Sequence, residues 1–296
     1  MHIRKGGGTI MSIEAHQLEH VYNPNTPFSH AALNKIDVTI PEGKITAIIG
    51  QTGSGKSTFV QHLNGLLIPT GGSLDVLGHH IQPLLKIQDV KQLRKEVGLV
   101  FQFPEYQLFE ETIEKDIAFG PKNFGSTEEE ANEMVKKILP VVGLDESYLD
   151  RSPFELSGGQ KRRIAIAGIL VLDPKVLVLD EPTAGLDPQG AQEMMTLFMN
   201  LNKKAGKTIL LVSHDMEHVM KYCDHVIVMD HGNIRKEADV KTFFQHPEWM
   251  EEIGINPPSI VRLKKTLQEK GFDIPQDILD MESLVQCIKG QVKKHE

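Results

Sequence analysis

The sequence is poor in the features that mark several specialised classes of protein. Its 296 residues include only two cysteines, Cys223 and Cys287. Two cysteines cannot form the disulfide framework of a small secreted domain, so a reducing cytosol is the expected compartment. Hydrophobic residues make up 40% of the chain and charged residues 24%. These values are close to those of ordinary globular proteins and exclude disordered, collagen-like and coiled-coil chains.

Long apolar runs and an excess of positive charge are also missing. The longest apolar run, residues 164–172, has nine residues, whereas a membrane-spanning helix needs about 20. A role at a membrane would therefore depend on partner proteins. The net charge is −8, from 32 basic and 40 acidic residues, so we expect no nucleic-acid partner. Residues 1–11 are basic but lack the apolar core of a signal peptide, and we expect a flexible extension with Met11 as a second candidate start.

Short apolar runs alternate with helical patterns along most of the chain. Strands are predicted over 36–40, 44–49, 97–101, 176–179, 208–212 and 225–229. Helices are predicted after Lys56, with Phe59, Leu63 and Leu66 on one face, over 126–138, and from Asp187 to Gly206. This alternation predicts an α/β core with a largely parallel sheet. From about residue 243 the apolar spacing is helical throughout, which predicts a C-terminal helical domain over 243–296.

A glycine-rich loop between a strand and a helix is the strongest functional motif. It consists of Gly50, Gln51, Thr52, Gly53, Ser54, Gly55, Lys56, Ser57 and Thr58. It matches the phosphate-binding pattern G-x-x-x-x-G-K-[ST] in its required strand–loop–helix context. The glycines let backbone amides converge on phosphate oxygens, Lys56 adds a charge at the β- and γ-phosphates, and Ser57 can bind Mg²⁺. A chance glycine-rich turn is the alternative, and the flanking strand and helix argue against it.

Polar side chains follow three of the predicted strands. Asp180 and Glu181 end the strand over 176–179. Beside a phosphate loop, Asp180 can hold Mg²⁺ directly or through water, and Glu181 can orient or deprotonate the attacking water. His214 is predicted to contact the γ-phosphate and that water, and Gln102 to bind Mg²⁺ and sense the nucleotide. Taken alone, His214 and Gln102 read more simply as ordinary surface residues.

A second anion-binding motif lies before the apolar run at 164–170. It consists of Leu156 followed by Ser157, Gly158, Gly159 and Gln160. Ser157 can cap the following helix, and the two glycines expose amides at its start. One chain with two phosphate-reading elements is explained most economically if the second element serves the nucleotide of another subunit.

Together these motifs resemble the nucleotide-binding subunit of an ATP-binding cassette (ABC) transporter. The order and spacing of the motifs match that family over residues 12–240. One further motif of the family lies at residues 184–187 and ends in Asp187. The resemblance implies a P-loop NTPase fold of ABC type, with a RecA-like parallel sheet, an antiparallel β-subdomain and a helical subdomain over about 103–170, all within 12–242. It further implies ATP and Mg²⁺ as ligands and two subunits paired head to tail. Each ATP would then lie between one phosphate loop and the partner's signature motif, with Asp187 at the dimer interface and Tyr22 stacked on adenine.

Residues 103–125 carry a finer resemblance. They run FPEYQLFEET and later DIAFGPKNFG, which is similar to the ATPases of energy-coupling factor (ECF) transporters, in detail to the second of their two ATPase subunits. These transporters import vitamins and transition-metal ions. The resemblance implies a heterodimer with a second homologous ATPase, a transmembrane coupling subunit, separate substrate-binding membrane subunits, and a peripheral position on the cytoplasmic face of the cell membrane. Phe103, Tyr106, Phe109 and Phe119 are predicted to line the groove for the coupling subunit, or alternatively to form ordinary core.

Four other functions explain the sequence less well. A conventional ABC importer for metals, amino acids or peptides shares the chemistry, but residues 103–125 and the helical tail argue against it. A non-transport ABC ATPase acting on DNA or ribosomes is disfavoured by the acidic balance and by the short distance from Gln102 to Leu156. A P-loop kinase or GTPase would not explain the second motif, and residues 202–205 lack the aspartate of a guanine-reading sequence. A purely binding role conflicts with the presence of both Glu181 and His214.

Overall fold

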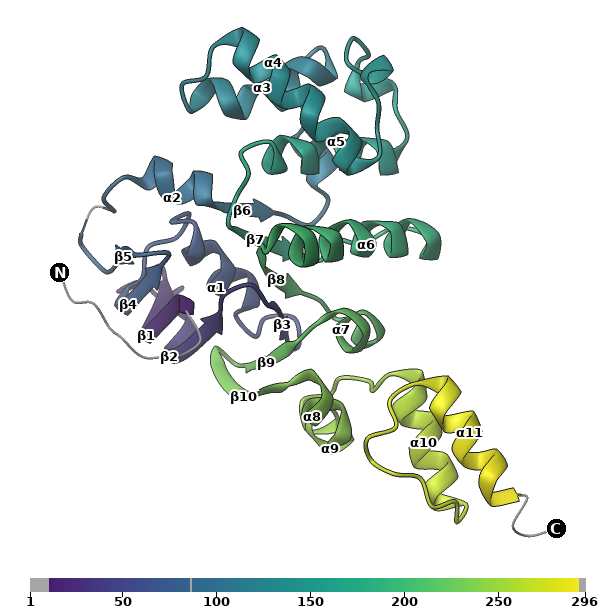
Figure 1. Cartoon of the computed structure of the whole chain (residues 1–296). Coiled ribbons are helices and arrows are strands. Elements are labelled where there is room, and N and C mark those ends of the chain that lie inside the picture. The colour runs from purple at the N-terminus through teal and green to yellow at the C-terminus, as the bar shows by residue number, and fades with distance from the viewer. Residues whose placement is uncertain (1–10, 86, 293–296) are drawn as a thin grey trace, which may run out of the picture.

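A computed structural model describes residues 11–85 and 87–292. The predicted flexible extension lies outside the described residues except for Met11, at which strand β1 begins. The fold contains two sheets (Figure 1). A four-stranded antiparallel sheet has the order β2-β1-β4-β5 and comprises β1 (Met11–Tyr22), β2 (His30–Pro41), β4 (Gly71–Val76) and β5 (His79–Ile81).

A six-stranded sheet forms the centre of the molecule. Its order is β10-β9-β3-β8-β7-β6, and its strands are β3 (Ile45–Ile49), β6 (Val97–Val100), β7 (Val176–Asp180), β8 (Thr208–Val212), β9 (His225–Asp230) and β10 (Asn233–Asp239). All neighbours are parallel except β9 and β10. Residues of β3, β6 and β8 are buried throughout, as expected of strands covered on both faces. The predicted parallel α/β core is confirmed.

Successive side chains of the central strands point to opposite faces of the sheet, and each face is covered by its own apolar cluster. Ala47 and Ile49 point into one cluster, which includes Phe198 of helix α6 (Pro188–Ala205). Ile48 points into the other, which includes Phe59 of helix α1 (Lys56–Leu63) and residues of the antiparallel sheet. The expectation that Leu66 continues the buried face of α1 is wrong. The helix ends at Leu63 and Leu66 is exposed, because the chain turns at Gly65, whose φ of +66° is left-handed.

A group of helices lies between β6 and β7 in the chain, and most of it extends away from the sheets (Figure 1). It contains η1 (Pro104–Gln107), α3 (Ile113–Asn123), α4 (Glu128–Ile138), η2 (Leu139–Val142), η3 (Glu146–Tyr148), η4 (Pro153–Glu155) and α5 (Gly158–Leu170). Thr127 and Glu130 form a reciprocal capping box at the start of α4, within the helix predicted over 126–138. The remaining helices near the sheets are α2 (Val90–Glu96) and α7 (Met216–Tyr222).

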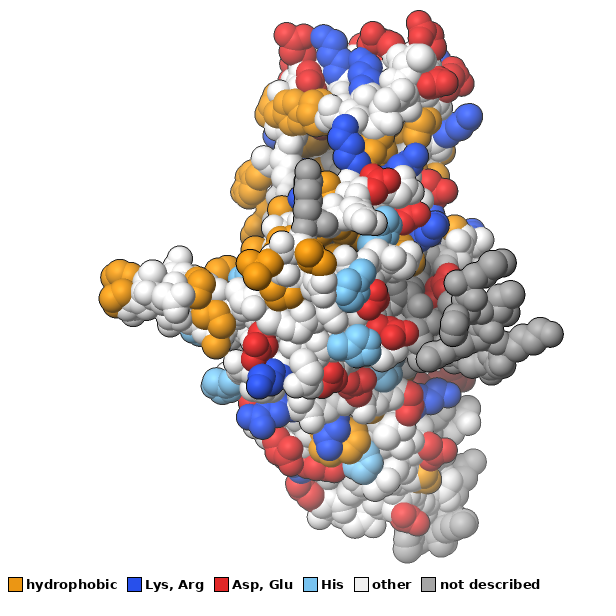
Figure 2. Space-filling view, turned by 90° about the vertical axis from the view of Figure 1, so that its left-hand side faces the viewer, with side chains coloured by type: hydrophobic (Ala, Val, Ile, Leu, Met, Phe, Trp, Pro, Cys, Tyr) orange, Lys and Arg blue, Asp and Glu red, His pale blue; other side chains and the backbone are white. Residues whose placement is uncertain are grey.

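The C-terminal part is helical, with α8 (Val240–Gln245), α9 (Pro247–Glu252), α10 (Ser259–Glu269) and α11 (Met281–Val292). Phe243 and Phe244 of α8 are buried in the same cluster as Phe198, so no break in the core marks residue 243 and the division there stays a prediction. Within residues 11–85 and 87–292, no helix combines the length and apolarity needed to cross a bilayer. Acidic and basic side chains are interspersed on the face shown in Figure 2.

Candidate functional site

One cavity of about 470 Å³ gathers most of the side chains predicted to form the nucleotide site. It lies where β3, β6, β7 and β8 end, because parallel neighbours bring their carboxyl ends to one edge of the sheet. The predicted residues that line it are Tyr22, Thr52, Gly53, Gly55, Lys56, Ser57, Thr58, Gln102, Asp180, Glu181 and His214. His30, Ala32 and Val212 also line it, and no motif in the sequence marks these three.

The start of the phosphate loop is fixed by close backbone packing. Gly50 has a φ of +150°, and a Cβ there would lie 2.1 Å from the carbonyl oxygen of Met229 on β9. Only glycine fits this approach. Gly50, Gln51 and Ser54 do not line the cavity. Ser54 is buried beneath the loop, and the side chain of Gln51 points away and donates from Nε2 to the Ile253 carbonyl oxygen at 3.0 Å.

Lys56 lies at the start of α1 and folds back over the loop. Its ammonium group donates to the carbonyl oxygens of Gly50 at 2.7 Å and Gln51 at 2.8 Å, and to the Ser54 hydroxyl at 3.3 Å. Burial lowers the pKa of Lys56, although the nearby carboxylates of Glu181 and Asp180 partly oppose this change. A partly desolvated cation held by neutral carbonyls is well suited to bind an anion.

Ser57 and Asp180 provide oxygen ligands side by side. Both line the cavity, and burial raises the pKa of Asp180, although the nearby Ser57 hydroxyl and the charge of Lys56 oppose this change. A cation bound there would offset the cost of burying the carboxylate. Hydroxyl, carboxylate and amide oxygens, the last from Gln102 in the same cavity, are the donors that Mg²⁺ prefers. The residues present therefore fit this ion.

Glu181 and His214 form a pair at the edge of the cavity. Nδ1 of His214 lies 2.8 Å from Oε1 of Glu181. The side chain of Glu181 is 16% exposed and that of His214 is 79% exposed. Glu181 also has a left-handed backbone with φ +50°, held by its amide donating to the Val212 carbonyl at 3.0 Å. Such strain in a non-glycine residue is common at functional sites.

Tyr22, the predicted adenine contact, lies at the end of β1. Its hydroxyl is 3.2 Å from the Thr58 hydroxyl, and its ring meets the imidazole of His20 edge-on, with 4.5 Å between ring centroids. His20 in turn lies 3.1 Å from Nε2 of the buried His62 on α1. Tyr22 is partly exposed, so its ring is held at one edge and available for stacking.

The second anion-binding motif lies outside this cavity. Ser157 caps α5 in a reciprocal capping box with Gln160, and Ser157, Gly158 and Gly159 are exposed. Gln160 lines a separate cavity and donates to the Tyr148 hydroxyl at 3.0 Å. Asp187 caps α6 by accepting from the Gly190 amide at 2.7 Å. The chain does not bring its own signature motif to its own phosphate loop.

One buried residue of this region could not be predicted from the sequence. Arg162 of α5 is 2% exposed and makes two hydrogen bonds to the carboxylate of Glu105, at 2.9 and 2.8 Å. It also donates to the carbonyl oxygens of Pro182 at 3.2 Å and Ala184 at 2.8 Å. Arg162 thus connects the helix of the second motif to the segment after Gln102 and to the segment after Glu181. Its sequence context, between Lys161 and Arg163, reads as a solvated basic cluster.

Known proteins match this chain over nearly its whole length. Residues 33–184 match the family model "ABC transporter", and residues 260–290 match the model "Energy-coupling factor transporter EcfA1 C-terminal domain". The energy-coupling factor transporter ATP-binding protein EcfA2 of Clostridium perfringens is 51% identical over 286 residues, which cover 95% of this chain and 99% of the relative. EcfA2 of Spiroplasma kunkelii is 54% identical over 87% of this chain and 85% of its own length.

Solved structures agree with these relatives. The structure of cbiO1 from Clostridium perfringens, described as part of the ABC transporter complex cbiONQ, has a TM-score of 0.71 and 37% identity, covering 86% of this chain and 99% of that one. A dimeric ATP-binding cassette, MJ0796, bound to ADP and Pi has a TM-score of 0.67 and 27% identity, covering 77% and 98%. The short C-terminal match refers to EcfA1, but the near full-length relatives are EcfA2 proteins, and the longer match decides between them. The chain therefore belongs to the ABC ATPases, within the family of energy-coupling factor transporter ATP-binding proteins.

Proposed function

We propose that this chain hydrolyses MgATP at a site shared with a second, homologous ATPase, and that the cycle drives import through an ECF-type transporter. The observation that carries the proposal is the convergence of Lys56, Asp180, Glu181 and His214 on one cavity, while the second anion-binding motif stays exposed elsewhere. The family supports the ATPase chemistry, and the geometry supports the division of one site between two chains.

ATP would bind with its phosphates in the loop and its adenine against Tyr22. Lys56 would donate to the β- and γ-phosphate oxygens, which are stronger acceptors than carbonyl oxygens because they are charged. Ser57, Gln102 and Asp180 would hold Mg²⁺, which neutralises phosphate charge when bound. Burial raises the pKa of Asp180 even though Lys56 lies nearby, and a bound cation would offset this cost of burying the carboxylate.

Glu181 is proposed to act as the general base toward the attacking water. Its carboxylate ends β7 at the edge of the cavity, and His214 contacts it at 2.8 Å. His214 is largely exposed and is therefore free to reach a γ-phosphate while it keeps Glu181 oriented. The left-handed backbone of Glu181 points to a side chain held in place for chemistry.

A second ATPase would supply the missing part of the site. Ser157, Gly158 and Gly159 present the start of α5 to solvent, where backbone amides and the helix dipole favour an anion. A head-to-tail dimer places this surface on the partner's nucleotide, with Asp187 between the chains. The dimeric cassette with ADP and Pi supports this arrangement.

Transport would depend on membrane partners that bind the group of helices around α3. The aromatic side chains there are the natural contact. Phe109 and Phe119 pack edge to face with centroids 4.9 Å apart, and Tyr106 is 85% exposed. We place this chain on the cytoplasmic face of the membrane, bound to a transmembrane coupling subunit, with separate membrane subunits that capture vitamins or transition-metal ions. The names of the relatives support a transporter complex of this kind.

Two variants test the catalytic assignment in the complex purified from native cells in mild detergent. Glu181→Gln should bind ATP, stop turnover and trap the closed dimer, because the amide cannot accept the proton of water. His214→Ala should retain ATP binding and reduce kcat by about 10²-fold or more. Steady-state hydrolysis at the wild-type rate by Glu181→Gln would refute Glu181 as the base. Mass spectrometry of the same complex should reveal a second ATPase and polytopic membrane proteins; recovery of ribosomes or DNA alone would refute transport.

A further inference from the structure

The side chain of Gln51 connects the phosphate loop to the C-terminal helices. Gln51 follows Gly50 in the loop, yet its amide nitrogen donates to the carbonyl oxygen of Ile253 at 3.0 Å, across 202 residues of sequence. No step of the proposed reaction uses this side chain, because it points out of the nucleotide cavity.

The acceptor of this hydrogen bond is rigidly held. Ile253 follows the last residue of α9, where the Gly254 amide donates to the Glu251 carbonyl at 3.1 Å and the Ile255 amide to the Met250 carbonyl at 2.9 Å. The side chain of Met250 is fully buried. The preceding residue, Trp249, lies under the ammonium group of Lys236 on β10, 4.2 Å from the ring centroid. The Ile253 carbonyl is therefore fixed relative to the central sheet.

The backbone of Gln51 holds the catalytic lysine. Its carbonyl oxygen accepts from Lys56 Nζ at 2.8 Å and from the Ser54 amide at 3.2 Å. The side chain of Gln51 thus contacts the C-terminal helices, while its backbone carbonyl contacts Lys56. A displacement of the side chain would move an acceptor on which the position of Lys56 depends.

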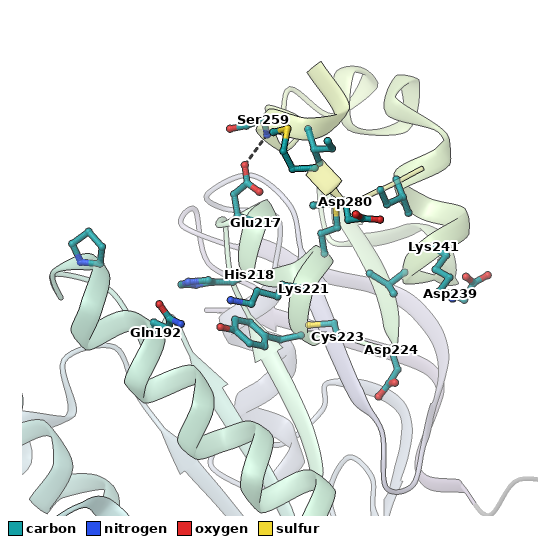
Figure 3. Close-up of a pocket in the computed structure, with 17 residues that line it drawn as sticks. Gln192, Glu217, His218, Lys221, Cys223, Asp224, Asp239, Lys241, Ser259 and Asp280 are labelled. Atoms are coloured by element: carbon teal, nitrogen blue, oxygen red, sulfur yellow. Dashed lines mark hydrogen bonds between the residues drawn. The ribbon is translucent and has the colours of Figure 1, made fainter. Parts of the chain in front are cut away.

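The segment that begins at Ile253 also contacts the helix that follows His214. We call residues 253–259 the bridging segment. At its far end the Ser259 amide donates to Oε1 of Glu217 at 2.7 Å (Figure 3). Glu217 lies in the first turn of α7, the helix that follows His214. This contact borders a cavity of about 900 Å³ between α6, α7 and the C-terminal helices. The bridging segment therefore touches the elements that follow both β3 and β8.

We propose that Gln51 is a positioning residue through which the bridging segment holds the phosphate loop in its nucleotide-binding geometry. The inference rests on the proposed function, since it requires that this cavity binds ATP. A loop already held in place loses less conformational freedom when a nucleotide binds, and binding is tighter for that reason. The C-terminal helices thereby set nucleotide affinity from outside the site.

Removal of one net hydrogen bond should weaken nucleotide binding about three- to tenfold. Gln51→Met keeps the length of the side chain and removes the donor. Gly254→Ala disturbs the same contact from the opposite side, because its Cβ would lie 2.4 Å from Nε2 of Gln51. Gly271→Ala is the matched control. Gly271 also has a left-handed backbone, with φ +92° against +66° at Gly254, but nothing lies within 4 Å of the added Cβ.

The experiment is calorimetric titration of the full-length variants with MgADP, which is not hydrolysed, alongside thermal unfolding. Gln51→Met and Gly254→Ala should each raise Kd three- to tenfold, and the double variant should bind no more weakly than the weaker single variant, because both act on one contact. Gly271→Ala should lower the melting temperature about as much as Gly254→Ala while leaving Kd unchanged, which separates affinity from stability.

Three results would overturn the inference: a Kd for Gln51→Met within twofold of wild type, additive effects in the double variant, or an equal loss of affinity in Gly271→Ala. Lys56→Ala distinguishes this failure from failure of the proposed function. Loss of MgADP binding in Lys56→Ala with normal binding in Gln51→Met would refute the positioning role alone. Wild-type binding in Lys56→Ala would refute the phosphate-loop assignment itself.

Discussion

The guanidinium group of Arg162 and the carboxylate of Glu105, 57 residues apart in sequence, form a two-point ion pair with bonds of 2.9 and 2.8 Å. Burial disfavours the charged form of Glu105, but the hydrogen bonds and charge of Arg162 outweigh this and hold its pKa below the usual value. Arg162 also lies near the ring of Phe103, 5.7 Å from the centroid. One buried cation thus organises three segments around the nucleotide cavity.

Replacement of Arg162 should therefore be costly. Arg162→Ala leaves the Glu105 carboxylate partly buried without its partner, and the free energy of unfolding should fall by about 3 kcal/mol, measured by urea denaturation at pH 7. The double variant with Glu105→Gln should recover part of that loss, because no uncompensated charge remains. A double variant no more stable than Arg162→Ala would show that lost packing, rather than the unpaired charge, causes the effect.

The first glycine of the phosphate loop should tolerate no side chain. In Gly50→Ala the new Cβ meets the Met229 carbonyl at 2.1 Å, so either the loop or the end of β9 must move. We expect a loss of more than about 2 kcal/mol in stability together with loss of ATP binding. Gly78→Ala is the control, because Gly78 has a left-handed φ of +86° with no neighbour within 4 Å. It should cost about 1 kcal/mol and leave ATP binding intact.

The buried imidazole of His62 should make stability depend on pH. Burial lowers its pKa to about 4, although its contact with the Thr58 carbonyl opposes the change. In the unfolded chain the same group titrates near 6.5. Between these values the unfolded state binds the extra proton, so stability should decrease as pH falls from about 6.5 to 4 and contribute no further change below that.

The variant His62→Met should remove this part of the pH dependence, which amounts to about 3 kcal/mol between the two limits. Urea denaturation at pH 4.5 and 7 measures the difference. Glu96, whose pKa is lowered to about 2, acts in a separate window below pH 4.5 and does not confuse the comparison. Equal pH slopes in wild type and His62→Met would contradict the assignment.

The exposed aromatic side chains near α3 should matter for assembly rather than folding. Tyr106→Ser should leave the melting temperature within about 2 °C of wild type, because the side chain is 85% exposed. It should reduce recovery of membrane subunits in a detergent pull-down. Phe28→Ser is the matched control, since Phe28 is 82% exposed but lies in the turn between β1 and β2. Equal recovery with both variants would contradict docking at Tyr106.

The central sheet could be predicted from the sequence because its strands are buried on both faces and read as continuous apolar runs. Strand β10 could not, since it lies at the sheet edge and none of its seven residues is fully buried; four are partly buried and three are exposed. Strand β5 is three residues long and carries no periodic signal. The Leu66 error has a similar cause, because apolar spacing continues past the residue at which the chain leaves the helix.

Within the candidate site, the motif residues were predictable because phosphate chemistry demands glycines, a lysine and a hydroxyl at fixed spacing. The contacts of Gln51 and Arg162 were not. Gln51 occupies a variable position of the motif, and its partner is a backbone carbonyl 202 residues away, which no local pattern encodes. Arg162 sits between two other basic residues, and only the packing of α5 shows which of the three is buried.

The capping box at Ser157 has a consequence for association. The Ser157 hydroxyl accepts from the Gln160 amide, and the Gln160 side chain bonds back to the Ser157 amide at 3.1 Å, so this helix start is already formed in the single chain. Two chains that meet with their anion-binding surfaces preformed have little backbone left to order at contact. Pairing should then be governed by the rate of encounter and by the bound nucleotide rather than by coupled folding.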